Sequence, residues 1–246
     1  MIFVIVLIIT AVRIKSMDSH RISGRILAEN IAGPGMLRLV EQSMQARARK
    51  TSVTEIAVKE RKHPQAALTF DDGPDIRYTP LLLDGLKERN VRVSFFLLGE
   101  KVEQYPELVE RMQKEGHLVG NHTYHHVQLN KLNETKVREE ILKTNNLIYE
   151  TTGVYPLYLR PPFGAWKKNL ELCVEMLPVF WTIDTLDWKV QNTEKIVRTV
   201  QEQIEDGAII LMHDEYDTSV EAALQVVDEL KNQGYELVTV DQLILP

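Results

Sequence analysis

The chain of 246 residues contains a single cysteine, Cys173, so no disulfide can form within it. Cys173 lies among apolar residues, which favours a buried structural thiol over a reactive one. Basic residues are also few, because 29 Lys and Arg face 35 Asp and Glu and leave a net charge of -6. This balance argues against the basic surface of a nucleic-acid-binding protein, and we expect no nucleic-acid partner.

The N-terminal apolar run is too short to span a bilayer, which needs roughly 20 apolar residues. Residues 1–12 are apolar except for Thr10, and Arg13 and Lys15 follow them. That length is typical of the apolar core of a signal peptide, so we expect residues 1–12 to target or anchor the chain at a membrane. A buried or edge strand is the alternative. The expected location is extracytoplasmic, anchored or secreted, with a cytoplasmic location left open.

The rest of the chain divides into a polar connector and a folded domain. Residues 13–64 form the connector, with a helix expected near 34–50 and a short strand near 55–58. From residue 65 to 246, short apolar runs alternate with amphipathic segments, at 66–70, 91–98, 117–120, 157–160, 179–184, 208–213 and 236–240. Alternation of this kind predicts α/β units around a parallel sheet, either a barrel or an open doubly wound sheet. No G-x-G-x-x-G follows the first run, so dinucleotide binding has no support.

Charged and imidazole side chains stand where the predicted strands end. In chain order they are Asp71, Asp72, His122, His126, Arg160, Asp184, Asp187 and His213. A buried strand has no structural need for charge at its end, and in a parallel barrel these ends meet at one rim. The pattern therefore predicts one converging site at the carboxyl-terminal rim.

Two histidines in this set have the spacing of metal ligands. His122 and His126 lie four residues apart, which would place both imidazoles on one face of a helical turn. Asp71 or Asp72 could add a carboxylate and complete a three-ligand site with an open position, the pattern of catalytic zinc. The other interpretation of Asp71-Asp72-Gly73-Pro74 is a simple turn, which explains the Gly and Pro but not two acids after a strand.

Five motifs in this order resemble the polysaccharide deacetylase family, also called the NodB-homology domain or carbohydrate esterase family 4. They are TFDDGP (69–74), HTYHH (122–126), RPPFG (160–164), DTLDW (184–188) and LMH (211–213). The resemblance covers about residues 65–244, and among the members of the family the chain resembles peptidoglycan N-acetylglucosamine deacetylases. It implies a distorted (β/α) barrel of about seven parallel strands, and residues 65–246 as the catalytic domain.

The resemblance also implies roles for the residues of the first three motifs. Asp71 would be the general base, and Arg160 would orient and tune it. Asp72, His122 and His126 would bind a divalent metal, with zinc expected and cobalt or another divalent ion as an alternative.

The remaining motifs would supply the acid and the acetyl pocket. His213 would be the general acid, with Asp187 as its carboxylate partner. The backbone N–H of Phe163 would help to hold the oxyanion, and Trp188 and Leu211 would line the pocket for the acetyl group.

The expected function is removal of N-acetyl groups from N-acetylglucosamine units of a cell-surface polysaccharide, with peptidoglycan preferred. Chitin oligomers, exopolysaccharide and O-acetyl xylan are alternative substrates, and a non-catalytic glycan-binding protein is the alternative outside enzymes. We expect a monomer whose partner is the polysaccharide.

Overall fold

The computed structural model describes residues 63–166 and 176–244, which all fall within one compact unit, Arg61–Pro246. The apolar segment 1–12, the helix expected near 34–50, the strand expected near 55–58 and Cys173 lie outside the described residues. Within the described part of the chain, no helix has the length and apolar character needed to cross a membrane.

The described residues form one parallel sheet whose strands run in the order β5-β4-β3-β2-β1-β7-β6, with β8 beside β1. No pairing joins β5 to β6 over these residues, so the sheet is a curved half-barrel there. The strands are β1 (Gln65–Asp71), β2 (Ser94–Leu97), β3 (Leu118–Asn121), β4 (Tyr158–Leu159), β5 (Leu177–Pro178), β6 (Ile183–Asp184), β7 (Ala208–His213) and β8 (Glu236–Leu237).

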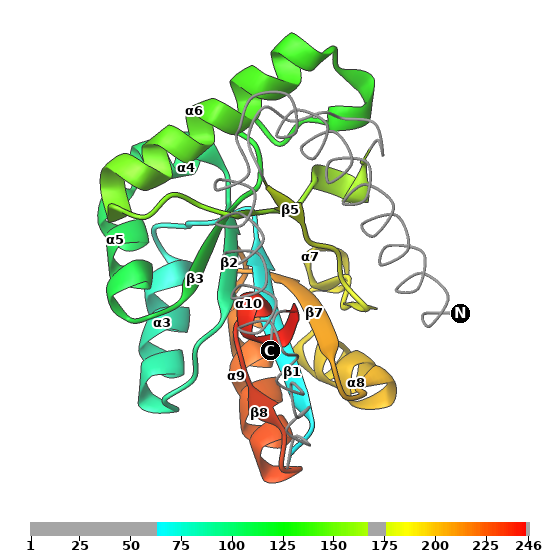
Figure 1. The fold of residues 1–246 in the computed structure, drawn as a ribbon. Helices are drawn as coiled ribbons and strands as arrows, with labels where there is room; N and C mark the ends of the chain where they lie inside the picture. Colours follow the sequence, from blue (N-terminus) through cyan, green and yellow to red (C-terminus); the bar gives the residue numbers. More distant parts are fainter. Residues whose placement is uncertain (1–62, 167–175, 245–246) are drawn as a thin grey trace, which may run out of the picture. The chain divides into compact units, whose positions relative to one another are not determined.

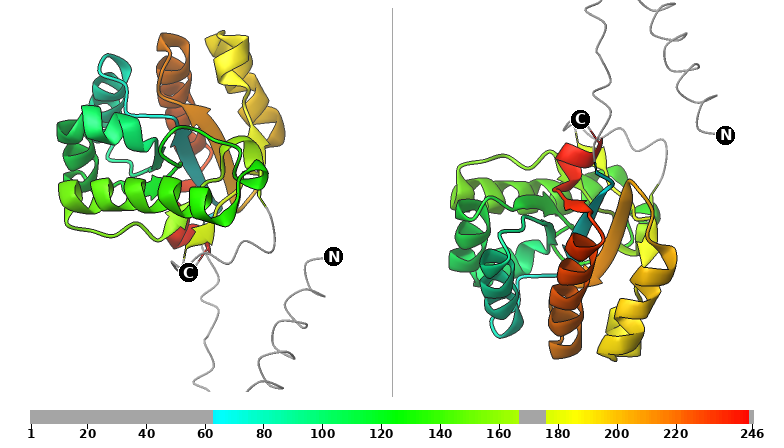
Figure 2. Two further views of the ribbon diagram at one scale, coloured as in Figure 1. Left: turned by 90° about the horizontal axis from the view of Figure 1, so that it is seen from above. Right: turned by 90° about the horizontal axis from the view of Figure 1, so that it is seen from below.

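Most of the helices follow a strand and pack on the outer side of the sheet, as Figures 1 and 2 show. They are α3 (Tyr78–Glu88), α4 (Gly99–Gln104), α5 (Pro106–Lys114), α6 (Glu134–Thr152), α7 (Asp187–Val190), α8 (Thr193–Gln203), α9 (Asp217–Asn232) and α10 (Val240–Ile244), with 3-10 turns η1 (Leu129–Lys131) and η2 (Pro162–Gly164). Pro106 begins α5, and Gly153 follows α6 with a φ of 73°, a conformation that glycine adopts without strain.

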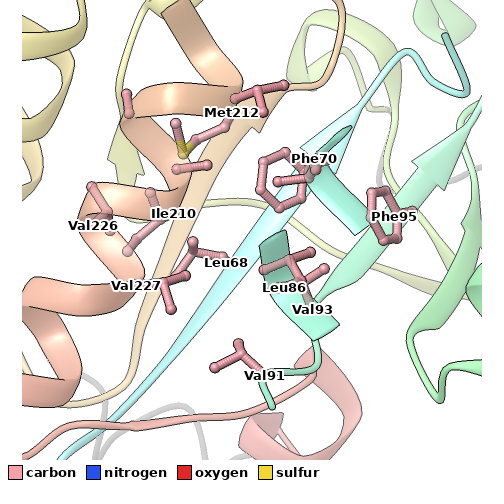
Figure 3. Packing of buried hydrophobic residues seen from close by; sticks show 14 of the residues in the cluster. Leu68, Phe70, Leu86, Val91, Val93, Phe95, Ile210, Met212, Val226 and Val227 are labelled. Atoms are coloured by element: carbon pink, nitrogen blue, oxygen red, sulfur yellow. The ribbon is translucent and has the colours of Figure 1, made fainter. Parts of the chain in front are cut away.

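Side-chain alternation on β1 and β7 divides the buried residues into two layers. One set of alternate residues packs against the helices in the main core, where Figure 3 shows Leu68 and Phe70 with Ile210 and Met212, beside Val226 and Val227 of α9. The other set faces the inside of the half-barrel, where Ala67 packs with a second cluster that includes Phe96 and Val240. Residues Thr69 and Asp71 continue this inner face toward the carboxyl end of β1.

The predicted fold class, an α/β distorted barrel, is confirmed. Each of the seven expected apolar runs contains a strand. The structure adds β5, an edge strand of two residues that includes Pro178. Proline cannot donate an N–H, and it is tolerated at a sheet edge because no neighbouring strand needs that donor. A strand of two residues is also too short to show a periodic pattern in the sequence.

Candidate active site

The carboxyl ends of β1 and β7 lie side by side at the rim. Asp71 is paired in register with His213, so the last residues of the two strands are neighbours. Both continue the inner faces of their strands, beyond Thr69 and Leu211 respectively. The predicted meeting of the charged residues from these two strand ends is therefore confirmed.

Asp71 is held by a buried arginine, Arg160, which follows strand β4. Arg160 is fully buried, with its guanidinium 4.2 Å from the ring centroid of Phe96. One terminal nitrogen of Arg160 donates to Asp71 Oδ1 at 2.8 Å and to Thr69 Oγ1 at 2.7 Å. This leaves Asp71 Oδ2 directed to the site, 3.7 Å from His122 Nε2. The Asp71 carboxylate therefore has one oxygen anchored and one available.

The prediction of a helical turn for the two histidines was wrong, although they do converge. The segment after β3 is irregular, and Thr123 and His126 have positive φ values of 69° and 54°. Nε2 of His122 and Nε2 of His126 each lie 3.4 Å from Asp72 Oδ1. One ligand atom from each of these three residues lies within 4.8 Å of the others. The two histidines of the candidate metal site are therefore brought together by a loop and not by a helix face, and Asp72 follows the end of β1.

The environment of Asp72 fits a bound cation. His122 Nδ1 donates to the carbonyl oxygen of Arg160 at 2.6 Å, which directs Nε2 toward Asp72. Within the described residues, Asp72 Oδ1 is buried and has no hydrogen-bond partner. A buried carboxylate oxygen without a partner is unfavourable unless a positive charge lies beside it. Two imidazoles and one carboxylate suit zinc or another divalent ion.

The protonation states of the ligand residues suit metal binding. Burial by itself would raise the pKa of Asp72, but the nearby imidazoles, His122 foremost, lower it well below its usual range. Burial lowers the pKa of His126. An ionised carboxylate and a neutral imidazole are the forms that coordinate a cation.

His213 forms an ion pair with Asp187 at the end of β7. Its Nδ1 lies 2.7 Å from Asp187 Oδ1, and its backbone N–H donates to Asp187 Oδ2 at 2.8 Å. Burial by itself would lower the pKa of His213, but the fully buried Asp187 raises it to about 9. His213 Nε2 lies 3.9 Å from Asp72 Oδ2 and therefore faces the ligand cluster. At neutral pH the imidazole carries a proton that it can donate into the site.

The three residues expected to contact the acetyl group lie on three segments of the rim. Phe163 has a φ of 59° and a mostly exposed ring that lies 4.5 Å from the ring of His126. Trp188 is half exposed on α7, next to Asp187, and Leu211 is buried on the inner face of β7. Phe163 is thus beside the ligand cluster, while the pocket roles of Trp188 and Leu211 stay predictions.

Two acidic residues shape the rim beside the predicted set. Asp184 Oδ1 accepts the Leu186 N–H at 3.0 Å and so closes the turn before α7. Asp214 is fully buried, accepts a hydrogen bond from the Thr79 hydroxyl, and lies against Gly73, where an added Cβ would come within 2.5 Å of its carboxylate. Burial raises the pKa of Asp214 to about 7. The sequence analysis missed Asp214, although an acid directly after His213 was a readable signal.

Fold and site together define an α/β half-barrel that gathers a candidate metal ligand set and two ion pairs, Asp71 with Arg160 and Asp187 with His213, at one rim. A model of the polysaccharide deacetylase family matches residues 58–180. The peptidoglycan-N-acetylglucosamine deacetylase PgdA of Listeria monocytogenes is 42% identical over 185 residues, which are 75% of this chain and 40% of that protein. A peptidoglycan-N-acetylglucosamine deacetylase of Bacillus cereus is 40% identical over 73% of this chain and 68% of its own length.

A third relative has a solved structure. The protein PdaC of Bacillus subtilis, described as a peptidoglycan-N-acetylmuramic acid deacetylase, is 42% identical over 72% of this chain and 38% of its own length. Its crystallised chain superposes with a TM-score of 0.72 at 41% identity, covering 74% of this chain and 91% of that chain. The chain belongs to the polysaccharide deacetylase family. It spans about 40% of the length of the Listeria relative.

Proposed function

We propose that this chain is a metal-dependent hydrolase that removes N-acetyl groups from N-acetylglucosamine units of a cell-surface polysaccharide, with peptidoglycan preferred. The observation that carries the proposal is that Asp71 and His213 both border the Asp72, His122 and His126 cluster. A carboxylate and a protonated imidazole beside a metal site suit hydrolysis of an amide.

Asp72, His122 and His126 would hold a divalent ion, zinc or another ion such as cobalt. When bound, the ion supplies Lewis-acid chemistry to the acetyl carbonyl and to the attacking water. The three ligands leave a coordination position open, as in catalytic zinc sites.

Asp71 is the proposed general base. Its Oδ2 takes the proton of the attacking water, while Arg160 holds Oδ1 and keeps the carboxylate in place. The resemblance adds the Phe163 N–H as a donor to the oxygen that gains negative charge, a contribution of about 3–4 kcal/mol for a well-placed donor.

His213 is the proposed general acid. Asp187 accepts from Nδ1, which directs the proton on Nε2 toward the departing nitrogen. Proton transfer by such a group typically contributes about 10²–10⁴-fold to the rate. Trp188 and Leu211 would line the acetyl pocket, and the products are acetate and a free amino sugar.

The substrate choice is supported by the relatives from Listeria monocytogenes and Bacillus cereus, which are peptidoglycan-N-acetylglucosamine deacetylases. Peptidoglycan lies outside the cytoplasmic membrane, which agrees with targeting or anchoring through residues 1–12. The proposed domain organisation keeps 13–64 as a connector and 65–246 as the catalytic domain, acting as a monomer.

Acetate release from a panel of substrates tests the proposal. The zinc-loaded protein is given N-acetylglucosamine oligomers, purified peptidoglycan and acetyl xylan at equal acetyl concentration. We expect release from the two N-acetylated substrates and a faster rate on peptidoglycan. Release from acetyl xylan alone would assign an esterase, and no release from any substrate, with zinc bound, would favour the non-catalytic glycan-binding alternative.

A further inference from the structure

Two of the three proposed metal ligands lie on one loop. The backbone conformation of this loop depends on side chains outside it. This ligand loop comprises residues 122–126, between β3 and η1. Thr123 and His126 both have positive φ, although neither is glycine. Backbone of this kind persists only where its surroundings fix it.

A single carboxylate from α6 holds the centre of the ligand loop. Glu140 Oε2 accepts the backbone N–H of Tyr124 at 3.0 Å and that of His125 at 2.9 Å. Its Oε1 lies 2.8 Å from Nδ1 of His125, and the Glu140 side chain is only 13% exposed. Hydrogen bonds to a carboxylate are stronger than those between neutral groups. Glu140 therefore binds the peptide groups that immediately precede His126.

The other polar groups of the loop backbone are anchored by rigid elements. The first N–H groups of α4, from Gly99 and Glu100, donate to the carbonyl oxygens of Thr123 and Tyr124 at 2.9 and 3.3 Å. Asn121 accepts the Thr123 N–H at 2.7 Å.

Asn121 is itself held by α6. Its Nδ2 donates to the carbonyl oxygen of Ile141 and to Asn145 Oδ1. The N–H groups of Thr123, Tyr124 and His125 are thus held by α6, directly or through Asn121, and α4 holds the carbonyl groups of Thr123 and Tyr124.

We propose that Glu140 is a positioning residue that sets the affinity of the metal site by fixing the ligand loop. Its carboxylate contacts the backbone N–H groups of Tyr124 and His125 and the ring of His125, and it acts through the backbone that places His126 near His122 and Asp72. This inference rests on the proposed metal-dependent function. Supporting residues of this kind typically change metal affinity by about 10–100-fold when altered.

The test compares Glu140→Gln with Glu139→Gln in the full chain. Glu139 is the adjacent residue on α6, is exposed, and pairs with Lys136 away from the loop, so the control makes the same chemical change. Zinc affinity of the metal-stripped proteins is measured by competition with a chromophoric chelator, and thermal unfolding is followed in the absence of metal.

We expect Glu140→Gln to weaken zinc binding by about 10–100-fold, with Glu139→Gln within twofold of the parent. Glutamine can place its oxygen where Oε2 accepts the two N–H groups, but it removes the negative charge that strengthens both hydrogen bonds. A merely structural role would lower the unfolding temperature and leave the zinc affinity of the folded protein unchanged, which would overturn the proposal.

Failure of the variant to fold and failure of the parent protein to bind zinc have separate consequences. If Glu140→Gln does not fold, Glu140→Asp keeps the charge on a shorter side chain, and unchanged zinc affinity in that variant also overturns the proposal. If the parent protein itself binds no zinc, the proposed metal site fails, which is a different result from equal affinities in parent and variant.

Discussion

Replacing Asp187 by Asn removes a negative charge that lies 2.7 Å from the ring of His213 and keeps a side chain of the same shape. Asparagine retains one oxygen to accept from the ring or from the backbone N–H of His213. The change therefore acts mainly on the charge of the ion pair, in a site where Asp187 is fully buried. Without that charge, burial is the dominant influence, and burial lowers the pKa of His213.

The expected magnitude follows from the pKa of His213. A fall from about 9 to the ordinary 6.5 corresponds to about 3 kcal/mol, at about 1.36 kcal/mol per pH unit. At pH 7.5 the protonated fraction falls from nearly all to about one tenth, so kcat/KM should fall about tenfold. At pH 8.5 the loss should be about 80-fold, and near pH 6 it should almost vanish.

The assay is the pH profile of kcat/KM for acetate release, with both proteins loaded with the same metal. A cation at Asp72 repels the protonated ring in both proteins, so the comparison between them is the informative quantity. Loss of ring orientation would lower the whole profile without moving its basic limb. A basic limb at the same pH in Asp187→Asn as in the parent would refute the assignment of His213 and Asp187 as acid and partner.

The same ion pair predicts how stability depends on pH in the metal-free protein. The folded-state pKa of His213 is raised, so the stabilisation is fully present below about pH 6.5 and is lost as the pH rises through about 9. The difference in free energy of unfolding between the parent and Asp187→Asn should therefore shrink by about 3 kcal/mol between pH 6 and pH 9.5. Urea unfolding at the two pH values measures this difference, and a constant difference would contradict the ion pair.

Three further substitutions test separate parts of the account. Asp71→Asn should abolish turnover and keep the metal, as measured by acetate release and zinc content, and loss of zinc would contradict the base assignment. His126→Ala should lose the metal because only two ligands stay, and full zinc retention would rule out its ligand role. Gly73→Ala should destabilise the fold by about 1–3 kcal/mol, because the new Cβ would lie 2.5 Å from the Asp214 carboxylate. An unfolding temperature of Gly73→Ala equal to that of the parent would contradict this, because it would show that the Asp214 side chain moves away without cost.

Positions at strand ends were predictable because parallel topology determines where they go. Asp71 and His213 each end a strongly apolar run, and side-chain alternation places each on the inner face. The pairing of β1 with β7, which no local pattern encodes, then makes the two residues neighbours. The positions of the strand ends could therefore be predicted from the sequence, whereas the register between the two strands is seen only in the structure.

The conformation of the ligand loop could not be predicted from the local sequence. A spacing of four residues suggested a helical turn, but Thr123 and His126 adopt positive φ because groups from α4 and α6 hold the backbone there. Those groups lie more than ten residues away in sequence, so the spacing of the histidines carries no trace of them. Glu140 was missed for the same reason, since on α6 it resembles any other glutamate beside a buried stripe.

Acetate release by metal-stripped protein, with and without added zinc, tests the central claim most directly. The substrate is purified peptidoglycan, and zinc-loaded Asp71→Asn serves as the control for contaminating activity. The account predicts release only when zinc is restored to the parent protein, with none from the control. Release without metal, or equal release from Asp71→Asn, would contradict a metal site served by Asp71 as the base.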